Sequence, residues 1–201
     1  MPESSDAVHL IVSDEGRYGV SARSPQLTGF EYARASMAEA QRDIHAVLAA
    51  LGVAQRPRIL HEERRYATAE GREYTVRVRA DDPADRVERL HTEQRIVAMM
   101  GTDQRFDCVA SNVANPMGEL AFVCALPTDT IGDVIDQMDE RDAVVLAVPV
   151  ADEGIWTMSF ESSPDNSEWP SLAEQGLTRE TSIHELLQRG DAAPRPVVAV
   201  R

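Results

Sequence analysis

The chain has 201 residues, of which 43% are hydrophobic, so it is long enough to bury a sizeable core and is not globally disordered. Its 34 acidic and 20 basic residues give a formal net charge of −14, which argues against a broad phosphate-binding surface and makes a nucleic acid an unlikely partner. All the basic residues are arginines, so no lysine is present for Schiff-base or P-loop chemistry.

The N-terminal stretch predicts a β-hairpin. Residues 7–12 form a short apolar strand, residues 14–16 form a turn, and residues 17–23 alternate in polarity as a returning strand. Pro25 and Gly29 then mark a loop that leads into a helix.

A well-marked amphipathic helix follows this loop. Ser36 and Glu39 have the spacing of a capping box at its start, and Gly52 suits its C-terminal cap. Apolar residues recur between them at steps of three and four, which places them on one stripe that must cover a sheet: Met37, Ala40, Ile44, Val47, Leu48 and Leu51.

Two more strands complete a first ββαββ unit. Residues 57–67 and 72–79 both alternate in polarity, with a turn between them, as expected of a half-buried antiparallel hairpin. A helix is predicted at 83–100, because Asp82 and Pro83 suit the N-cap and the first helical position.

A second ββαββ unit is predicted after this connecting helix. Strands are expected at 105–111, 119–126, 143–150 and 154–160, with a helix at 128–138 and turns at 115–118 and 152–154. The predicted fold class is therefore α+β, with antiparallel sheets carrying one helix each. The domains are 1–80 for the first unit, 81–101 for the connecting helix, 102–161 for the second unit, and 162–201 for a linker and a short helical tail.

The sequence offers no catalytic or metal-binding motif. His61-Glu62-Glu63-Arg64-Arg65 lacks the second histidine of the H-E-x-x-H zinc motif and lies in a predicted strand. Cys108 and Cys124 both lie in strand-like apolar runs, which favours buried, reduced thiols. We expect no enzyme activity, no metal and no cofactor.

Location follows from two further absences. The residues before the first strand are acidic and polar, unlike a signal peptide, and no apolar run has the roughly 18 residues that a membrane span needs. We therefore expect a cytoplasmic protein without membrane contact.

The stretch 172–187 has some features of a helix-turn-helix, including Gly176 at the turn. Its first helix is one residue short, and the second carries Glu180 and Glu185 beside Arg179. These acids and the overall charge favour a tail that packs on the rest of the chain over a DNA-binding element.

Residues 18–52 resemble the HicB family of bacterial antitoxins. The matching features are Tyr18-Gly19-Val20, then Ser24-Pro25-Gln26-Leu27-Thr28-Gly29, then Ser36-Met37-Ala38-Glu39-Ala40 at the helix start. The resemblance covers less than a quarter of the chain, and residues 30–34 depart from the glycine-rich segment usual there. It implies a degenerate ribonuclease-H-like sheet with one helix, which covers a small basic ribonuclease toxin.

The expected function is therefore that of a non-catalytic acidic protein, from a bacterium or phage, that binds a basic protein partner and forms a homo-oligomer. Three alternatives remain open: an assembly or accessory protein of a phage or mobile element, a nuclease built on the sheet, and an autorepressor that uses residues 172–187.

The candidate partner-binding residues are Tyr18, Pro25, Leu27, Phe30 and Glu31. The apolar loop needs cover, so Leu27 and Phe30 either anchor a partner or fold under and pack against the start of the helix.

Overall fold

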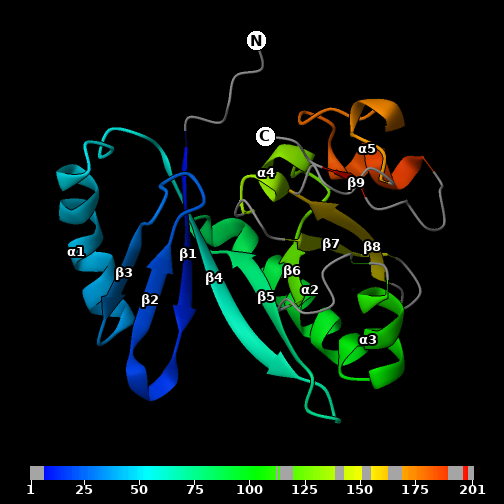
Figure 1. Ribbon diagram of the computed structural model, residues 1–201, viewed down its shortest axis with the longest axis horizontal. Helices are drawn as coiled ribbons and strands as arrows, with labels where there is room; N and C mark the ends of the chain where they lie inside the picture. Colours follow the sequence, from blue (N-terminus) through cyan, green and yellow to red (C-terminus); the bar gives the residue numbers. More distant parts are fainter. Residues whose placement is uncertain are drawn as a thin grey trace.

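The computed structural model describes residues 7–111, 113, 120–138, 143–150, 155–162, 169–189 and 197–198. In this part of the chain, nine strands form one sheet in the order β3-β2-β1-β4-β5-β6-β7-β8-β9 (Figure 1). The strands are β1 (Val8–Asp14), β2 (Val20–Arg23), β3 (Glu31–Arg34), β4 (Arg58–Ala67), β5 (Glu73–Arg79), β6 (Leu120–Cys124), β7 (Ala143–Pro149), β8 (Ile155–Glu161) and β9 (Val197–Val198).

Helices cover both faces of the sheet. The α-helices are α1 (Met37–Ala50), α2 (Pro83–Met100), α3 (Asp103–Ala110), α4 (Ile131–Ile135) and α5 (Ile183–Gln188), with 3-10 turns η1 (Gly16–Tyr18) and η2 (Ala173–Gln175). None of the described helices combines the length and the apolar character needed to cross a membrane.

Alternation along the strands assigns each helix to a face. Val76 of β5 packs with Ile96 of α2 and Phe106 of α3, whereas Val123 of β6 packs with Ile131 of α4 and Ile183 of α5. Because Val76 lies opposite Phe122, the residue before Val123, these two cores lie on opposite faces. Helix α1 lies on the same face as α2, over β1, β2 and β3.

Helix α1 forms as its local signals predict. The Ser36 side chain accepts a hydrogen bond from the Glu39 amide at 3.3 Å, and Leu48 on the apolar stripe is fully buried. Leu51, which the pattern places on the same stripe, is instead the C-cap and is 52% exposed. The stripe therefore ends one turn earlier than predicted.

The sheet is mixed, which the sequence pattern does not reveal. β1 pairs with β4 in parallel, as do β5 with β6 and β6 with β7, while β1 with β2, β2 with β3, β4 with β5 and β7 with β8 are antiparallel. The connection from β5 to β6 contains α2 and α3, and the connection from β6 to β7 contains α4. Both connections step in the same direction along the sheet, but their helices lie on opposite faces, so the two crossovers have opposite handedness.

Mixed α/β structure is confirmed, but the layout of two ββαββ units is not. The strand predicted at 105–111 is helix α3, because Phe106 and Val109 lie three residues apart and both turn into the core beside Tyr74. Cys108 is consequently exposed on that helix and not buried. The predicted loop before α1 contains strand β3. The turns predicted at 115–118 and 152–154 lie outside the described residues.

The C-terminal segment packs onto the sheet around a local two-fold arrangement. Thr130 and Ser182 each begin a capping box, at α4 and α5, and they pair with each other as an antiparallel bridge. Ile131 N donates to Thr181 O at 3.0 Å, and Ile183 N donates to Asp129 O at 2.8 Å, so the two segments exchange a reciprocal pair of hydrogen bonds. The stretch 172–187 thus forms η2 and one short helix, with Ile183 and Leu186 buried.

Candidate functional site

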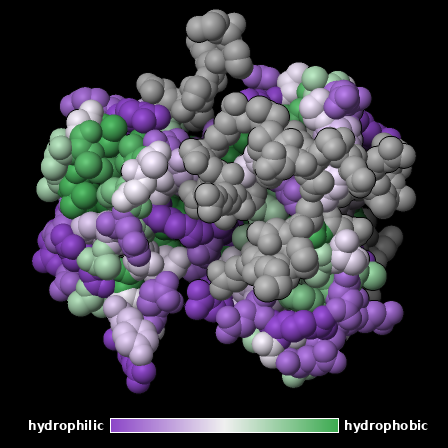
Figure 2. All heavy atoms as spheres, viewed as in Figure 1, coloured by the Kyte–Doolittle hydropathy of each residue, from purple (hydrophilic) through white to green (hydrophobic). Residues whose placement is uncertain are grey.

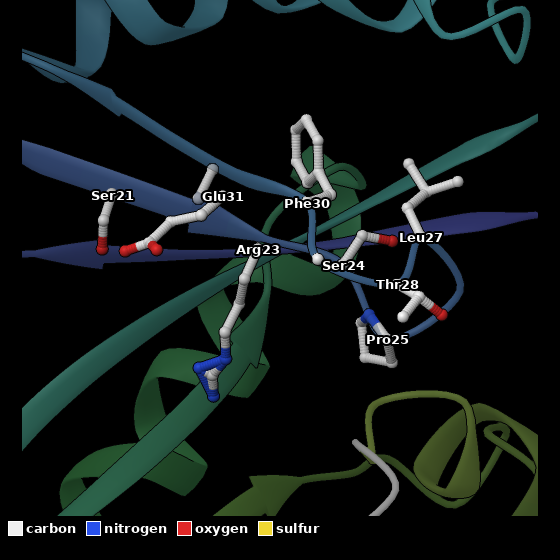
Figure 3. A pocket seen from close by; sticks show the side chains of 10 residues that line it. Ser21, Arg23, Ser24, Pro25, Leu27, Thr28, Phe30 and Glu31 are labelled. Carbon is white, nitrogen blue, oxygen red and sulfur yellow. The ribbon is translucent and has the colours of Figure 1, made fainter.

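Four of the five candidate binding residues line one open hollow of about 640 Å³ at the connection between β2 and β3 (Figure 3). Pro25, Leu27, Phe30 and Glu31 lie within seven residues of each other, and Arg23 and Ser24 complete the same wall. Tyr18 does not belong to the hollow. It lies in η1, before β2, where it is 75% exposed and Arg17 stacks over its ring at 4.7 Å.

Two consecutive turns shape the loop between β2 and β3. Leu27 N donates to Ser24 O at 3.2 Å, and Phe30 N donates to Leu27 O at 2.8 Å. In Figure 3 the side chains of Leu27 and Phe30 point toward the helix at the top, and those of Arg23 and Pro25 point the other way. The loop therefore presents an apolar side and a polar side.

The apolar side of the loop packs on α1 and β1. Leu27 and Phe30 are half-buried against Leu10 and Leu48, and the Phe30 ring stacks on Tyr32 with 6.5 Å between centroids. Both residues therefore fold under toward α1. Phe30 also belongs to the cluster that contains Met37 at the start of the helix, whereas Leu27 clusters with Leu48 near its end and not with its start, where the sequence interpretation placed it. Their exposed halves line the hollow.

Glu31 begins β3 on the other face of the sheet. It is exposed, and it lies opposite Arg23 in the antiparallel register of β2 and β3. Arg23 donates to Glu63 at 3.1 Å, so its charge is directed to the buried side of the sheet. Within the described residues, Glu31 itself has neither an ion pair nor a side-chain hydrogen bond.

Beneath the hollow, on the face opposite α1, lies a buried polar network that sequence reasoning missed. His9 of β1 and His61 of β4 are 1% and 2% exposed, with His9 Nδ1 3.0 Å from His61 Nε2. Glu63 accepts from Ser13 at 2.9 Å and from Arg77 Nε at 2.6 Å.

Gln26 lies in the loop and connects this network to the segment that follows α4. Its Oε1 accepts from the His9 amide at 3.0 Å, and its Nε2 donates to the Asp136 carbonyl, just after α4, at 2.6 Å. Arg77 makes a parallel connection, because its NH1 donates to the Gln137 carbonyl at 2.7 Å. The loop that lines the hollow is thus held both by β1, through His9, and by the segment after α4, through Asp136.

Burial sets the protonation of this network. Desolvation lowers the pKa of His9, and desolvation together with the neighbouring His9 lowers the pKa of His61 well below its ordinary value. Burial acts to raise the pKa of Glu63, but the Arg77 cation, assisted by Arg23, outweighs it and the pKa falls below its ordinary value. The histidines are therefore neutral and Glu63 is charged near pH 7.

The network could have been found only through the pairing of β1 with β4. The register places Ile11 beside His61 and Ser13 beside Glu63, so the polar residues of two alternating strands fall on one face. Parallel pairing joins residues about 50 positions apart, and no local pattern in the sequence indicates it.

The described residues contain no group of three or more His, Cys, Asp or Glu side chains that can hold a metal ion. His9 and His61 offer two imidazoles without a third ligand, and Glu63 is occupied by two arginines. The hydrogen bonds of Gln26 to His9 and Asp136 hold the loop in place.

Comparison with known proteins gives no relative. No family model matches the chain, and no curated protein and no solved structure does so either.

Proposed function

We propose that this protein is a non-catalytic, acidic binding protein that covers a basic protein partner such as a toxin ribonuclease, as its resemblance to HicB-like antitoxins implies. The observation that carries the proposal is the open hollow at the edge of the sheet, which gathers Pro25, Leu27, Phe30 and Glu31 on a chain of net charge −14. Charge of this size speeds the encounter with a basic partner and helps to select it.

The surface around α1 supports a binding role. Figure 2 shows an apolar area over the side of the molecule that carries α1, bordered by hydrophilic residues. Apolar areas with a polar rim are typical of surfaces that bind other proteins. Leu51, at the end of α1, is one of the large apolar residues that remain exposed.

The buried network supports binding over catalysis. His9, His61 and Arg77 are each at most 3% exposed; the two histidines contact each other, and Arg77 donates to Glu63 and to the Gln137 carbonyl. A general acid or base must reach the proton it transfers, and these groups are not accessible to a substrate.

The test is coexpression with the product of the neighbouring reading frame. If that product is a small basic ribonuclease, we expect a tagged form of this chain to copurify with it and to suppress its cleavage of RNA. A neighbouring product that neither binds nor is inhibited would contradict the proposal. The solution mass of the purified chain tests whether it forms the expected homo-oligomer. The same measurement separates the proposal from its rival, because an assembly protein would form large homo-oligomers and retain no basic partner.

Absence of catalysis needs its own measurement. The purified chain is incubated with labelled RNA and DNA in Mg²⁺ and in Mn²⁺, and we expect no cleavage. Metal-dependent cleavage that Asp43→Asn abolishes would show that the protein is a nuclease.

A further inference from the structure

Strand β3 is one end of the nine-stranded sheet and pairs only with β2 in the described part of the chain. The carbonyl oxygen of Arg34 points toward β2, because a side chain built on Gly19 would collide with it. Backbone direction alternates along an antiparallel strand, so the amides and carbonyls of Glu31 and Ala33 point away from β2, toward the open edge. Among the described residues the Ala33 carbonyl accepts a hydrogen bond from the half-buried Arg34 side chain, at 2.8 Å, which agrees with this direction.

A strand added at this edge would meet a different chemistry on each face. Glu31 and Ala33 lie on the face opposite α1, where Glu15 accepts from Ser21 at 3.3 Å and stays exposed. Side chains that the added strand places on this face would therefore meet the Glu31 carboxylate on β3, with the Glu15 carboxylate one strand further in, beside Ser21 of β2. On the other face its side chains would meet Phe30, which is half-exposed beside the buried Tyr32, and the Arg34 side chain, which stacks over Tyr32 at 4.1 Å and is paired with Asp43 at 3.1 Å.

We propose that the edge of β3 is the docking site for an extended segment of a basic partner, in which basic and apolar residues alternate. The inference rests on the proposed function for the identity of the partner, and it adds where and how that partner binds. The segment adds a tenth strand beside β3, donating to and accepting from Glu31 and Ala33, with its basic residues facing Glu31 and Glu15 and its apolar residues facing Phe30.

A partner of opposite charge is favoured over a second copy of this chain. Two copies would each bring a net charge of −14 to the contact, and this repulsion opposes pairing of two β3 edges. The strand is also only four residues long, so the hydrogen bonds it offers are few and side-chain complementarity must supply the selectivity.

The test uses a fluorescent ten-residue peptide in which arginine and valine alternate, with binding followed by anisotropy at physiological salt. A peptide of the same composition, with all its arginines at one end, controls for charge alone. Ala33→Pro removes an amide that points outward, so it blocks the edge while leaving the bonds between β2 and β3 in place. Ala33→Thr keeps the amide and is the matched control for this variant. Glu31→Gln tests the charge on the strand, and Glu180→Gln, at a distant exposed position, is its control.

We expect the alternating peptide to bind more tightly than the block peptide. Ala33→Pro should weaken binding of the alternating peptide about tenfold or more, and Glu31→Gln should weaken it several-fold. The control variants Ala33→Thr and Glu180→Gln should bind it as the wild type does. Equal binding of the two peptides, or full binding to Ala33→Pro, would overturn the proposal. So would a wild-type dimer that Ala33→Pro converts to monomer, because the edge would then bind a second copy. If Ala33→Pro still inhibits a neighbouring ribonuclease, the proposed function stands and only this docking site is wrong.

Discussion

His9 Nδ1 and His61 Nε2 face each other at 3.0 Å on adjacent parallel strands, with both rings buried and nearly coplanar at 13°. One nitrogen must donate and the other must accept, so a single proton lies between them. A second proton would set two donors against each other in a site that water does not reach. The charged groups that act on the pair are Asp133, Asp136, Arg79 and Asp81 for His9, and Arg77, Arg79 and Arg89 for His61.

This pair predicts a loss of stability in mild acid. The pKa of each histidine is lower in the folded chain than in the unfolded chain, where it is near 6.5. The unfolded state therefore binds protons first, and the free energy of unfolding falls as the pH drops below about 6.5, with a slope of up to about 1.4 kcal/mol per pH unit for each histidine.

Urea denaturation at a series of pH values measures this slope. The double variant His9→Leu/His61→Leu should lose most of it between pH 7 and pH 5, while His91→Gln, at an exposed position, should keep it. A double variant with the full slope would show that other groups cause the acid sensitivity. Glu63 acts in a lower window, because its depressed pKa gives stability that is lost only as the pH falls below about 4.5.

The end of the α1 stripe gives a second prediction. Leu48 is fully buried under the helix, whereas Leu51, three residues later, is 52% exposed. Leu48→Ala should lower the free energy of unfolding by about 2–5 kcal/mol, and Leu51→Ala should change it by less than about 0.5 kcal/mol. Similar losses in the two variants would mean that the helix packs through its last turn as well.

Gly19 gives a third prediction. It has φ +95°, and a Cβ there would collide with the Arg34 carbonyl, whereas Gly16 has φ +61° and open space around the same position. Gly16→Ala should cost about 1 kcal/mol from backbone conformation alone. Gly19→Ala should cost more and should expose the amides of β3 to hydrogen exchange. Equal costs, with β3 still protected, would refute the close approach of β2 and β3.

Phe30 gives a fourth prediction. It is half-buried against Tyr32 and α1, so Phe30→Ala should lower the free energy of unfolding by about 1–3 kcal/mol. Binding of the alternating peptide to the folded variant then reports on the exposed half of the ring. A stability loss with unchanged binding would limit Phe30 to packing, and unchanged stability would contradict its place in the core.

Elements with signals close together in the sequence were predictable. Asp82 and Pro83 begin α2 where expected, and Gly101 ends it, because caps and apolar stripes act within one or two turns. Helix α3 was not predictable, because the short apolar pattern of the segment 105–111 fits a strand as well as a helix. The helical form of this segment depends on the packing of Phe106 and Val109 beside Tyr74, which is distant in the sequence.

The candidate site divides in the same way. Pro25, Leu27, Phe30 and Glu31 come together because one short loop carries them, whereas Tyr18 is separated from them by the length of β2. The His9–His61 pair was out of reach, because a strand pairing across 52 residues creates it and neither histidine has a metal-ligand or catalytic spacing.

Strand β5 joins the two halves of the sheet, which are β1 to β4 on one side of it and β6 to β9 on the other. It bonds to β4 on one side and to β6 on the other, and its Arg77 also reaches the carbonyl that follows α4. Neither half can lose its structure without stripping one side of this strand of its partners. The two halves should therefore melt in one cooperative transition, with a calorimetric enthalpy equal to the van't Hoff enthalpy.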